Sequence, residues 1–221
     1  MSAAEKGGGA REPGALRRLV EGLDARDPAL TGHSELVSVY AARIATRLGH
    51  PLESVERMLL AGTVHDLGKV VLPDSILFKP GPLTPDEWDA VRRHPEAGAA
   101  MLAEAGFEDV AVWVLHHHER IDGSGYPHGL AGDDIPLESR ILAVADAYEA
   151  MTADRVYRAR LGHDAACAEL RRCAGSQFDP DVVDAFLGAA PDELRELSER
   201  GRFPRSSRPP RESRRSGAAE R

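Results

Sequence analysis

At the end of an apolar segment the chain reads His65-Asp66-Leu67-Gly68-Lys69. A neutral imidazole next to a carboxylate supplies two metal ligands within one helical turn, and the two oxygens of Asp66 are enough to bridge a pair of ions. Alone, a His-Asp pair is a weak signal, because adjacent polar residues at a helix end are commonly a cap or a solvated face. Its meaning depends on what the rest of the chain supplies.

Further side chains suited to metal binding lie on both sides of this stretch. The candidate ligands are His33, His65, Asp66, His94, His117, His118 and Asp146. Nitrogen and oxygen donors in this number suffice for two ions with positions left for water. The sequence therefore predicts a hydrolytic site with a dinuclear centre. The remaining histidines, His50, His116, His128 and His163, are predicted to be solvated or hydrogen-bonded, although His116 is close enough in sequence to exchange roles with its neighbours.

Composition restricts the class of protein. The chain has 221 residues, of which 42% are hydrophobic, so we expect one well-filled domain. A net charge of -8 argues against a general binder of nucleic acid polymers, which normally presents a cationic surface to phosphates. Cys167 and Cys173 are too few for a disulfide framework and are predicted to be small buried residues.

The two ends differ in composition from the middle. Residues 1–14 are rich in Gly, Ala and charge, and the segment from Arg202 to Arg221 contains seven arginines. Neither end has enough apolar residues to order itself, so we expect a domain over 15–200 between a disordered segment at 1–14 and a disordered basic tail at 201–221. The tail has the charge to contact nucleic acid or anionic lipid, but a solvated end is the favoured interpretation. With no apolar stretch of membrane-spanning length, the sequence predicts a cytoplasmic protein.

Apolar spacing in the middle of the chain is helical, and period-two alternation is absent. One predicted face contains Val37, Tyr40 or Ala41, Ile44 and Leu48, and the next contains Val55, Met58, Leu59 and Gly62. Thr84-Pro85-Asp86-Glu87 has the form of a capping box, which predicts a helix that carries His94. The fold class is therefore predicted to be all-α.

A loop rich in Gly and Pro is predicted over Asp122 to Pro136, entered directly from the helix end that carries His117 and His118. Pro136 opens a helix with Asp146 one step from its apolar face. Short helices are predicted around Ala165–Cys173, Pro180–Leu187 and Pro191–Glu199. The loop is a candidate wall of the active site.

The order of these motifs resembles the HD-GYP family, a branch of the HD-domain metal-dependent phosphohydrolases. The resemblance runs from about Thr31 to Pro180. Its motifs are Thr31-Gly32-His33-Ser34, His65 through Lys69, Leu77 through Thr84, His94-Pro95, His117 through Pro127, and Asp146 through Arg158. The resemblance implies an HD-domain-like helical bundle with a Gly/Pro-rich GYP loop, and hydrolysis of cyclic di-GMP to linear pGpG or on to GMP.

Carried over by position, the resemblance assigns roles within the site. It implies one ion held by His33, His65, Asp66 and Asp146, and another held by Asp66, His94, His117 and His118. It places Lys69, Glu149, Arg155 and Arg158 near the substrate phosphates, with Asp66 and Lys69 as the catalytic pair. Some family members bind a third ion through a Glu at the position of Ala29, which cannot coordinate. We therefore expect two divalent ions, and a ligand set without thiolate favours iron or manganese.

Several alternatives remain open at this stage. The chain is either an enzyme or a receptor that binds cyclic di-GMP or a partner protein without turnover, and another cyclic dinucleotide such as cyclic GMP-AMP is a possible substrate. The loop around Tyr126 has a packing role or docks a protein partner. Lys69 is balanced between a phosphate contact and a plain cation at a helix end. Glu119 is expected to orient a metal-ligand histidine.

Overall fold

The computed structural model describes residues 13–26, 28–153 and 160–188. Its α-helices are α1 (Pro13–Arg26), α2 (Pro28–Arg47), α3 (Leu52–Val64), α4 (Asp74–Leu77), α5 (Pro85–Val91), α6 (His94–Glu104), α7 (Glu108–Leu115), α8 (Leu137–Thr152), α9 (His163–Cys173) and α10 (Pro180–Leu187). Two short 3-10 helices are η1 (Leu67–Val71) and η2 (Gly132–Asp134). Within these residues the regular structure is helical except for an isolated bridge between Ala174 and Phe178, so the predicted all-α class is confirmed.

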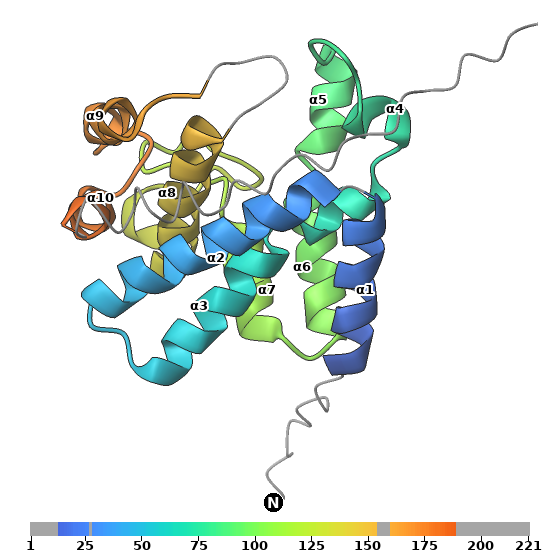
Figure 1. Cartoon of the computed structure of the whole chain (residues 1–221), viewed down its shortest axis with the longest axis horizontal. Coiled ribbons are helices and arrows are strands. Elements are labelled where there is room, and N and C mark those ends of the chain that lie inside the picture. The colour runs from blue at the N-terminus through green and yellow to red at the C-terminus, as the bar shows by residue number, and fades with distance from the viewer. Residues whose placement is uncertain (1–12, 27, 154–159, 189–221) are drawn as a thin grey trace, which may run out of the picture.

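Helix α2 crosses the middle of the bundle and organises it (Figure 1). It packs along α3 and against α8, while α6 packs against α7 and η1. In the view of Figure 1, α9 and α10 lie at one side and α1 at the other, and α4 and α5 project above the body of the molecule. The elements that carry the candidate ligands therefore meet around α2.

The core confirms the apolar face predicted for α2 except at Leu48, which lies just beyond the end of the helix and is partly buried. Val37, Tyr40, Ala41 and Ile44 have at most 1% of their surface exposed. The ring of Tyr40 lies 5.1 Å from that of Tyr148 on α8, which lies 4.6 Å from the ring of Phe186 on α10. Burying three aromatic side chains together contributes several kcal/mol, so this cluster fixes α2, α8 and α10 relative to one another.

The face predicted for α3 is wrong at one residue. Met58, Ala61 and Gly62 are buried as the helical period requires, but Leu59 is 39% exposed because it lies next to Met58 and so points about 100° away around the helix. A Cβ on Gly62 would lie 2.3 Å from the Cα of Ser38. The missing side chain allows α3 to approach the α2 backbone closely.

The capping box at Thr84 is confirmed, but the helix that it starts does not carry His94. The Thr84 hydroxyl accepts from the Glu87 amide, and the Glu87 carboxylate accepts from the Thr84 amide. Helix α5 then ends at Val91, and His94 begins a separate helix, α6. The cause is Pro95, which has no N–H to donate to the carbonyl of Val91 four residues earlier.

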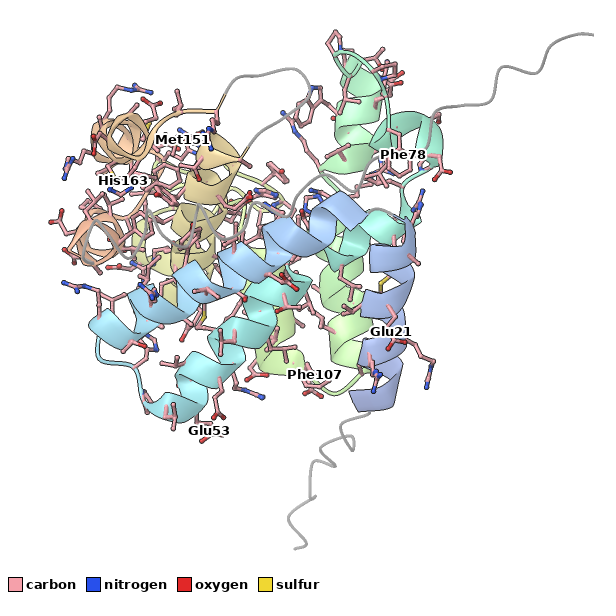
Figure 2. The ribbon with its side chains drawn as sticks, viewed as in Figure 1. Glu21, Glu53, Phe78, Phe107, Met151 and His163 are labelled. Carbon is pink, nitrogen blue, oxygen red and sulfur yellow. The ribbon has the colours of Figure 1, made fainter. Side chains whose placement is uncertain are left out.

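The second half of the domain follows the predicted order. Helix α8 buries Ile141, Val144 and Tyr148 completely and leaves Asp146 partly exposed beside them. Helices α9 and α10 lie where short helices are predicted. The ring of His163, near the α8 residue Met151 in Figure 2, hydrogen-bonds to the Tyr148 hydroxyl at 2.8 Å. Cys167 and Cys173 are both buried, as predicted.

Helix α1 begins at Pro13, within the last two residues of the segment 1–14 that was predicted to be disordered. The predicted helix at Pro191–Glu199 and the tail at 201–221 lie outside the described residues. Arg26 at the end of α1 donates to the Val70 carbonyl at 2.7 Å and also contacts the Leu72 carbonyl and Asp74. These contacts attach α1 to the segment that follows Lys69. No helix among the described residues is long and apolar enough to cross a membrane.

Candidate metal centre

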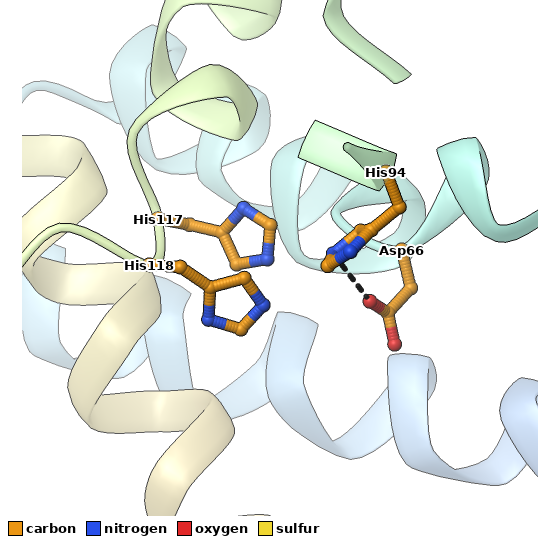
Figure 3. Close-up of side chains that lie close together, drawn as sticks. All are labelled: Asp66, His94, His117 and His118. Carbon is orange, nitrogen blue, oxygen red and sulfur yellow. Dashed lines mark ion pairs between the residues drawn. The ribbon is translucent and has the colours of Figure 1, made fainter. Parts of the chain in front are cut away.

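The fold brings the seven predicted ligands together from separate elements. His33 comes from α2, His65 and Asp66 follow α3, His94 begins α6, His117 and His118 follow α7, and Asp146 is on α8. Asp66, His94, His117 and His118 form one group, with all their ligand atoms within 4.8 Å of one another (Figure 3). His33, His65 and Asp66 form a second group with the same spacing. The Oδ1 of Asp146 lies beside this second group, 3.3 Å from His33 Nε2 and 4.0 Å from His65 Nε2.

Asp66 belongs to both groups, and its two oxygens face different ones. Oδ1 lies 3.3 Å from Nε2 of His94. Oδ2 lies 3.5 Å from Nε2 of His65 and 3.8 Å from Nε2 of His33. The Lys69 ammonium is 2.5 Å from the same Oδ2. The carboxylate therefore has the geometry of a bridge between two cation sites, and one of its oxygens already contacts a positive charge.

Three of the histidines are oriented by the backbone. Nδ1 of His65 lies 2.8 Å from the carbonyl of Gly62, Nδ1 of His94 lies 2.7 Å from that of Val91, and Nδ1 of His117 lies 2.5 Å from that of Val114. Because a carbonyl only accepts, each Nδ1 carries the proton and donates it. Each Nε2 is then left with a lone pair that points into the site, which is the usual arrangement behind a metal ligand.

The buried ring nitrogens test whether the site suits a cation. Within the described part of the chain, Nε2 of His94 and Nε2 of His117 are buried with no hydrogen-bond partner. A buried polar atom without a partner costs about 1–3 kcal/mol. A divalent cation at the centre of the first group would give both lone pairs a partner, so the residues present fit a metal ion.

The charge state also suits a cation. Burial lowers the pKa of His65, that of His117 and, to about 4, that of His118, so these rings are neutral at pH 7. Burial acts to raise the pKa of Asp66, but Lys69 and His65 hold it well below its usual value. His33 does the same to the pKa of Asp146. These three histidines therefore offer neutral nitrogens, and the two aspartates offer ionised oxygens.

His33 is held differently from the other ligands. It lies within α2, and its Nδ1 contacts Oε2 of Glu149 on α8. Burial acts to lower the pKa of His33, but Asp146 and Glu149 raise it to about 10. Glu149 itself is only 5% exposed. This placement puts Glu149 behind a metal ligand, and it does not favour the substrate contact that the resemblance implies for this residue.

Contacts of Tyr126 and Glu119 help to fix the loop after His118. The Tyr126 ring stacks on the His118 ring at 4.8 Å between centroids and 29° between planes. The buried Glu119 carboxylate accepts from the amides of His128 at 2.7 Å and Leu130 at 3.1 Å. Glu119 therefore closes the loop, whereas the sequence led us to expect it beside a metal-ligand histidine. His116 faces His128, 3.2 Å away, so it does not exchange roles with its neighbours.

Gly68 sets the distance between the His-Asp stretch and α6. A Cβ at this position would lie 1.9 Å from the carbonyl oxygen of His94 and 2.6 Å from the amide nitrogen of Gly98. Any side chain would push η1 away from α6, and with it Asp66 away from His94. Of the predicted substrate contacts, Lys69 lies at this junction, whereas Arg155 and Arg158 are outside the described residues.

Comparison with known proteins identifies the family. The HD domain family model matches residues 18–182, so the chain belongs to the HD domain family. Phosphohydrolases of this family use divalent metals, and the described His/Asp cluster is able to bind them. The resemblance predicted from the motifs is therefore confirmed.

Two curated relatives and one solved structure illustrate the match. The chain is 44% identical over 180 residues to the cyclic di-GMP phosphodiesterase response regulator RpfG of Xanthomonas campestris pv. campestris, covering 80% of this chain and 48% of that protein. It is 38% identical over 181 residues to 3'3'-cGAMP-specific phosphodiesterase 3 of Vibrio cholerae, covering 79% and 39%. The structure of an HDG"Y"P protein from Bdellovibrio bacteriovorus superposes with a TM-score of 0.59 at 19% identity, covering 75% and 52%. The chain thus spans about half the length or less of these relatives.

Proposed function

We propose that this chain is a metal-dependent phosphodiesterase that hydrolyses cyclic di-GMP to linear pGpG, to GMP, or to both. The observation that carries the proposal is the position of Asp66, whose Oδ1 faces His94 while its Oδ2 faces His33 and His65. A shared carboxylate between two nitrogen-rich groups is the arrangement expected of a two-metal phosphodiester hydrolase. The relative named as a cyclic di-GMP phosphodiesterase supports the choice of substrate.

Two divalent ions, iron or manganese, are the proposed cofactors. One would be held by His33, His65, Asp66 and Asp146, and the other by Asp66, His94, His117 and His118. The described ligand set combines imidazoles with carboxylates and contains no thiolate, which favours these metals over a structural zinc site. When bound, the ions supply Lewis acidity, which activates water and neutralises charge on the attacking and leaving oxygens.

The protein's own residues would position the reaction. Lys69 and His65 hold the pKa of Asp66 well below its usual value against the opposing effect of burial, so Asp66 keeps its charge when substrate enters. The Lys69 ammonium lies 2.5 Å from Asp66, and we propose that it contacts a phosphate oxygen of substrate bound next to the ligands. We propose Arg155 and Arg158, which lie outside the described residues, as further phosphate contacts, because a planar guanidinium group matches the geometry of a phosphate. Tyr126 keeps the His118 ring in place.

Turnover of cyclic di-GMP by protein loaded anaerobically with iron or manganese tests the proposal, with products separated by chromatography and metal content measured on the same sample. We expect linear dinucleotide or GMP from the wild type and none from Asp66→Ala. His116→Ala is the matched control, because His116 follows α7 but faces His128. Tight binding without product would instead make the protein a receptor, which is the competing function.

A second candidate substrate is 3'3'-cGAMP, because a relative at 38% identity is named for that substrate. Parallel assays with both dinucleotides distinguish the two by their kcat/KM values. A protein partner at the GYP loop and a cytoplasmic location remain predictions from the sequence.

A further inference from the structure

A cleft of about 310 Å³ opens beside the metal centre, between α5 and the GYP loop. It is lined by Pro85, Trp88, Asp89, Arg92 and Tyr126. Its volume is at the lower end of the range of roughly 300–1,000 Å³ for small-molecule sites. None of these five residues has a role in the metal centre, except that Tyr126 supports His118.

Tyr126 is the wall that the cleft shares with the metal centre. Its ring lines the cleft and stacks on His118 with 4.8 Å between centroids. The other wall is also close to the centre, because Arg92 precedes the ligand His94 by two residues. A group bound in the cleft would therefore be separated from the metal ligand His118 by the ring of Tyr126. Another part of a substrate would lie at such a distance while its phosphate is hydrolysed at the metal centre.

The side chains of the cleft suit an aromatic base. Trp88 is 47% exposed, an unusual state for the largest apolar side chain on a surface. The Arg92 guanidinium lies 5.9 Å from the centre of the Tyr126 ring. Exposed aromatic rings and planar guanidinium groups are the surfaces on which proteins stack unpaired nucleic acid bases. The capping box at Thr84 fixes the start of α5, so Trp88 is presented from an ordered turn.

The Asp89 carboxylate would allow the cleft to distinguish guanine from adenine. An ionised carboxylate only accepts hydrogen bonds. Guanine presents two adjacent donors, N1–H and the N2 amino group, on its Watson–Crick edge, whereas adenine presents one donor, the N6 amino group, beside an acceptor at N1. Asp89 is exposed, and its Oδ1 lies 3.9 Å from a guanidinium nitrogen of Arg92. A carboxylate so placed favours guanine and disfavours adenine.

We infer that this cleft is the guanine subsite of the substrate, with the base stacked on Trp88 and its Watson–Crick edge on Asp89. The inference deepens the proposed function and rests on it. It assigns base recognition to α5, while the metal ligands and Lys69 act on the phosphate.

The two tryptophans of the chain, Trp88 and Trp113, permit a test that does not depend on turnover. Trp113→Phe leaves Trp88 as the only tryptophan, and Trp113 lies on α7 outside the cleft. We expect GMP to quench Trp88 fluorescence saturably, and AMP to require about tenfold higher concentration for the same effect, in keeping with the loss of a hydrogen-bonded edge. Cyclic di-GMP should quench at lower concentration than GMP.

Three further variants separate stacking from nonspecific quenching. Trp88→Phe, which retains Trp113, should show no saturable quenching and should raise the KM for cyclic di-GMP about tenfold, as expected for a weaker stacking ring. Asp89→Asn should reduce the preference for GMP over AMP, whereas Asp86→Asn on the same helix should not. Phe78→Ala removes an equally exposed aromatic side chain beyond the cleft, next to α4 (Figure 2), and should leave quenching and turnover unchanged.

The outcomes separate this inference from the proposed function. Turnover of cyclic di-GMP without quenching of Trp88 would overturn the guanine subsite and leave the phosphodiesterase intact. Saturable, guanine-selective quenching without turnover would support the subsite in a receptor. Equal quenching by GMP and AMP, or quenching of Trp113 in Trp88→Phe, would also overturn it, as would the absence of both quenching and turnover.

Discussion

His65, His94 and His117 are held by backbone carbonyls, whereas His33 is held by a carboxylate. The first three follow or begin helices, where the last carbonyls of a helix have no partner in the helix itself and are available to Nδ1. His33 lies within α2, where the backbone carbonyls are used by the helix, so its Nδ1 contacts Glu149 from α8. The position of a ligand along its helix thus decides what can orient it.

The two kinds of support differ in how they can be lost. A carbonyl cannot be removed by substitution, so the three backbone-held histidines depend on the path of the chain. The support of His33 is one side chain and is removable.

Asp66→Ala should have the largest effect, because Asp66 is the ligand common to both groups and the partner of Lys69. We expect turnover to fall by about 10³-fold or more and metal content to fall for both ions. Metal analysis together with the chromatographic assay measures this. Retention of two ions by Asp66→Ala would show that the carboxylate is not shared.

Gly68→Ala should come next, because its Cβ would lie 1.9 Å from the His94 carbonyl oxygen. The clash must move η1 away from α6, which we expect to cost about 3 kcal/mol of stability and to separate Asp66 from His94. Thermal or urea denaturation of the metal-free protein measures the cost. Gly81→Ala is the matched control, since a Cβ there has nothing within 4 Å; an equal loss in both variants would contradict the argument.

Glu149→Gln sharpens the comparison at His33. The amide keeps the size of the side chain but loses the charge that favours a donating Nδ1, so the affinity of the His33 side for its ion should fall about 10- to 100-fold. The affinity of the His94 side should be unchanged. Competitive metal titration resolves the two sites. A uniform loss at both sites would mean that Glu149 supports the fold rather than His33.

Pro95→Ala should have the smallest effect of these four substitutions. The effect should fall on metal binding by the group that contains His94. It restores an N–H that can compete with His94 Nδ1 for the Val91 carbonyl. We expect a loss of metal affinity of less than about tenfold at the His94 side, because the competing bond does not remove the carbonyl. The same titration measures it. A loss confined to the His33 side would count against the carbonyl argument.

Local sequence signals predicted much of this protein. Helical spacing gives the inward faces of α2 and α8, and the capping box gives the start of α5, since each depends on residues within one or two turns. The seven candidate ligands follow from residue type and from the family resemblance, and the fold brings all seven together. Their assignment to two ions remains a proposal.

Contacts between distant residues were not predictable in the same way. Glu149 is 116 residues from His33, and no local pattern indicates that pair. Glu119 was predicted to orient a metal-ligand histidine, but its carboxylate accepts from the loop amides of His128 and Leu130. The break between α5 and α6 could have been predicted from Pro95, because its missing N–H marks a helix boundary. The exposure of Leu59 could also have been predicted, because in a helix it points about 100° away from the buried Met58.

The histidine rings held by backbone carbonyls also affect the stage at which the entropic cost of ordering the metal ligands is met. Fixing a side chain in one rotamer costs conformational entropy, and here Nδ1 of His65, His94 and His117 is fixed by carbonyls of the protein's own backbone. The aromatic core of Tyr40, Tyr148 and Phe186 is likewise built from the protein's own side chains. In a zinc finger, by contrast, metal binding and folding are one event. We therefore expect this chain to meet the entropic cost of ordering three ligands when it folds, so that less of that cost opposes the binding of an ion.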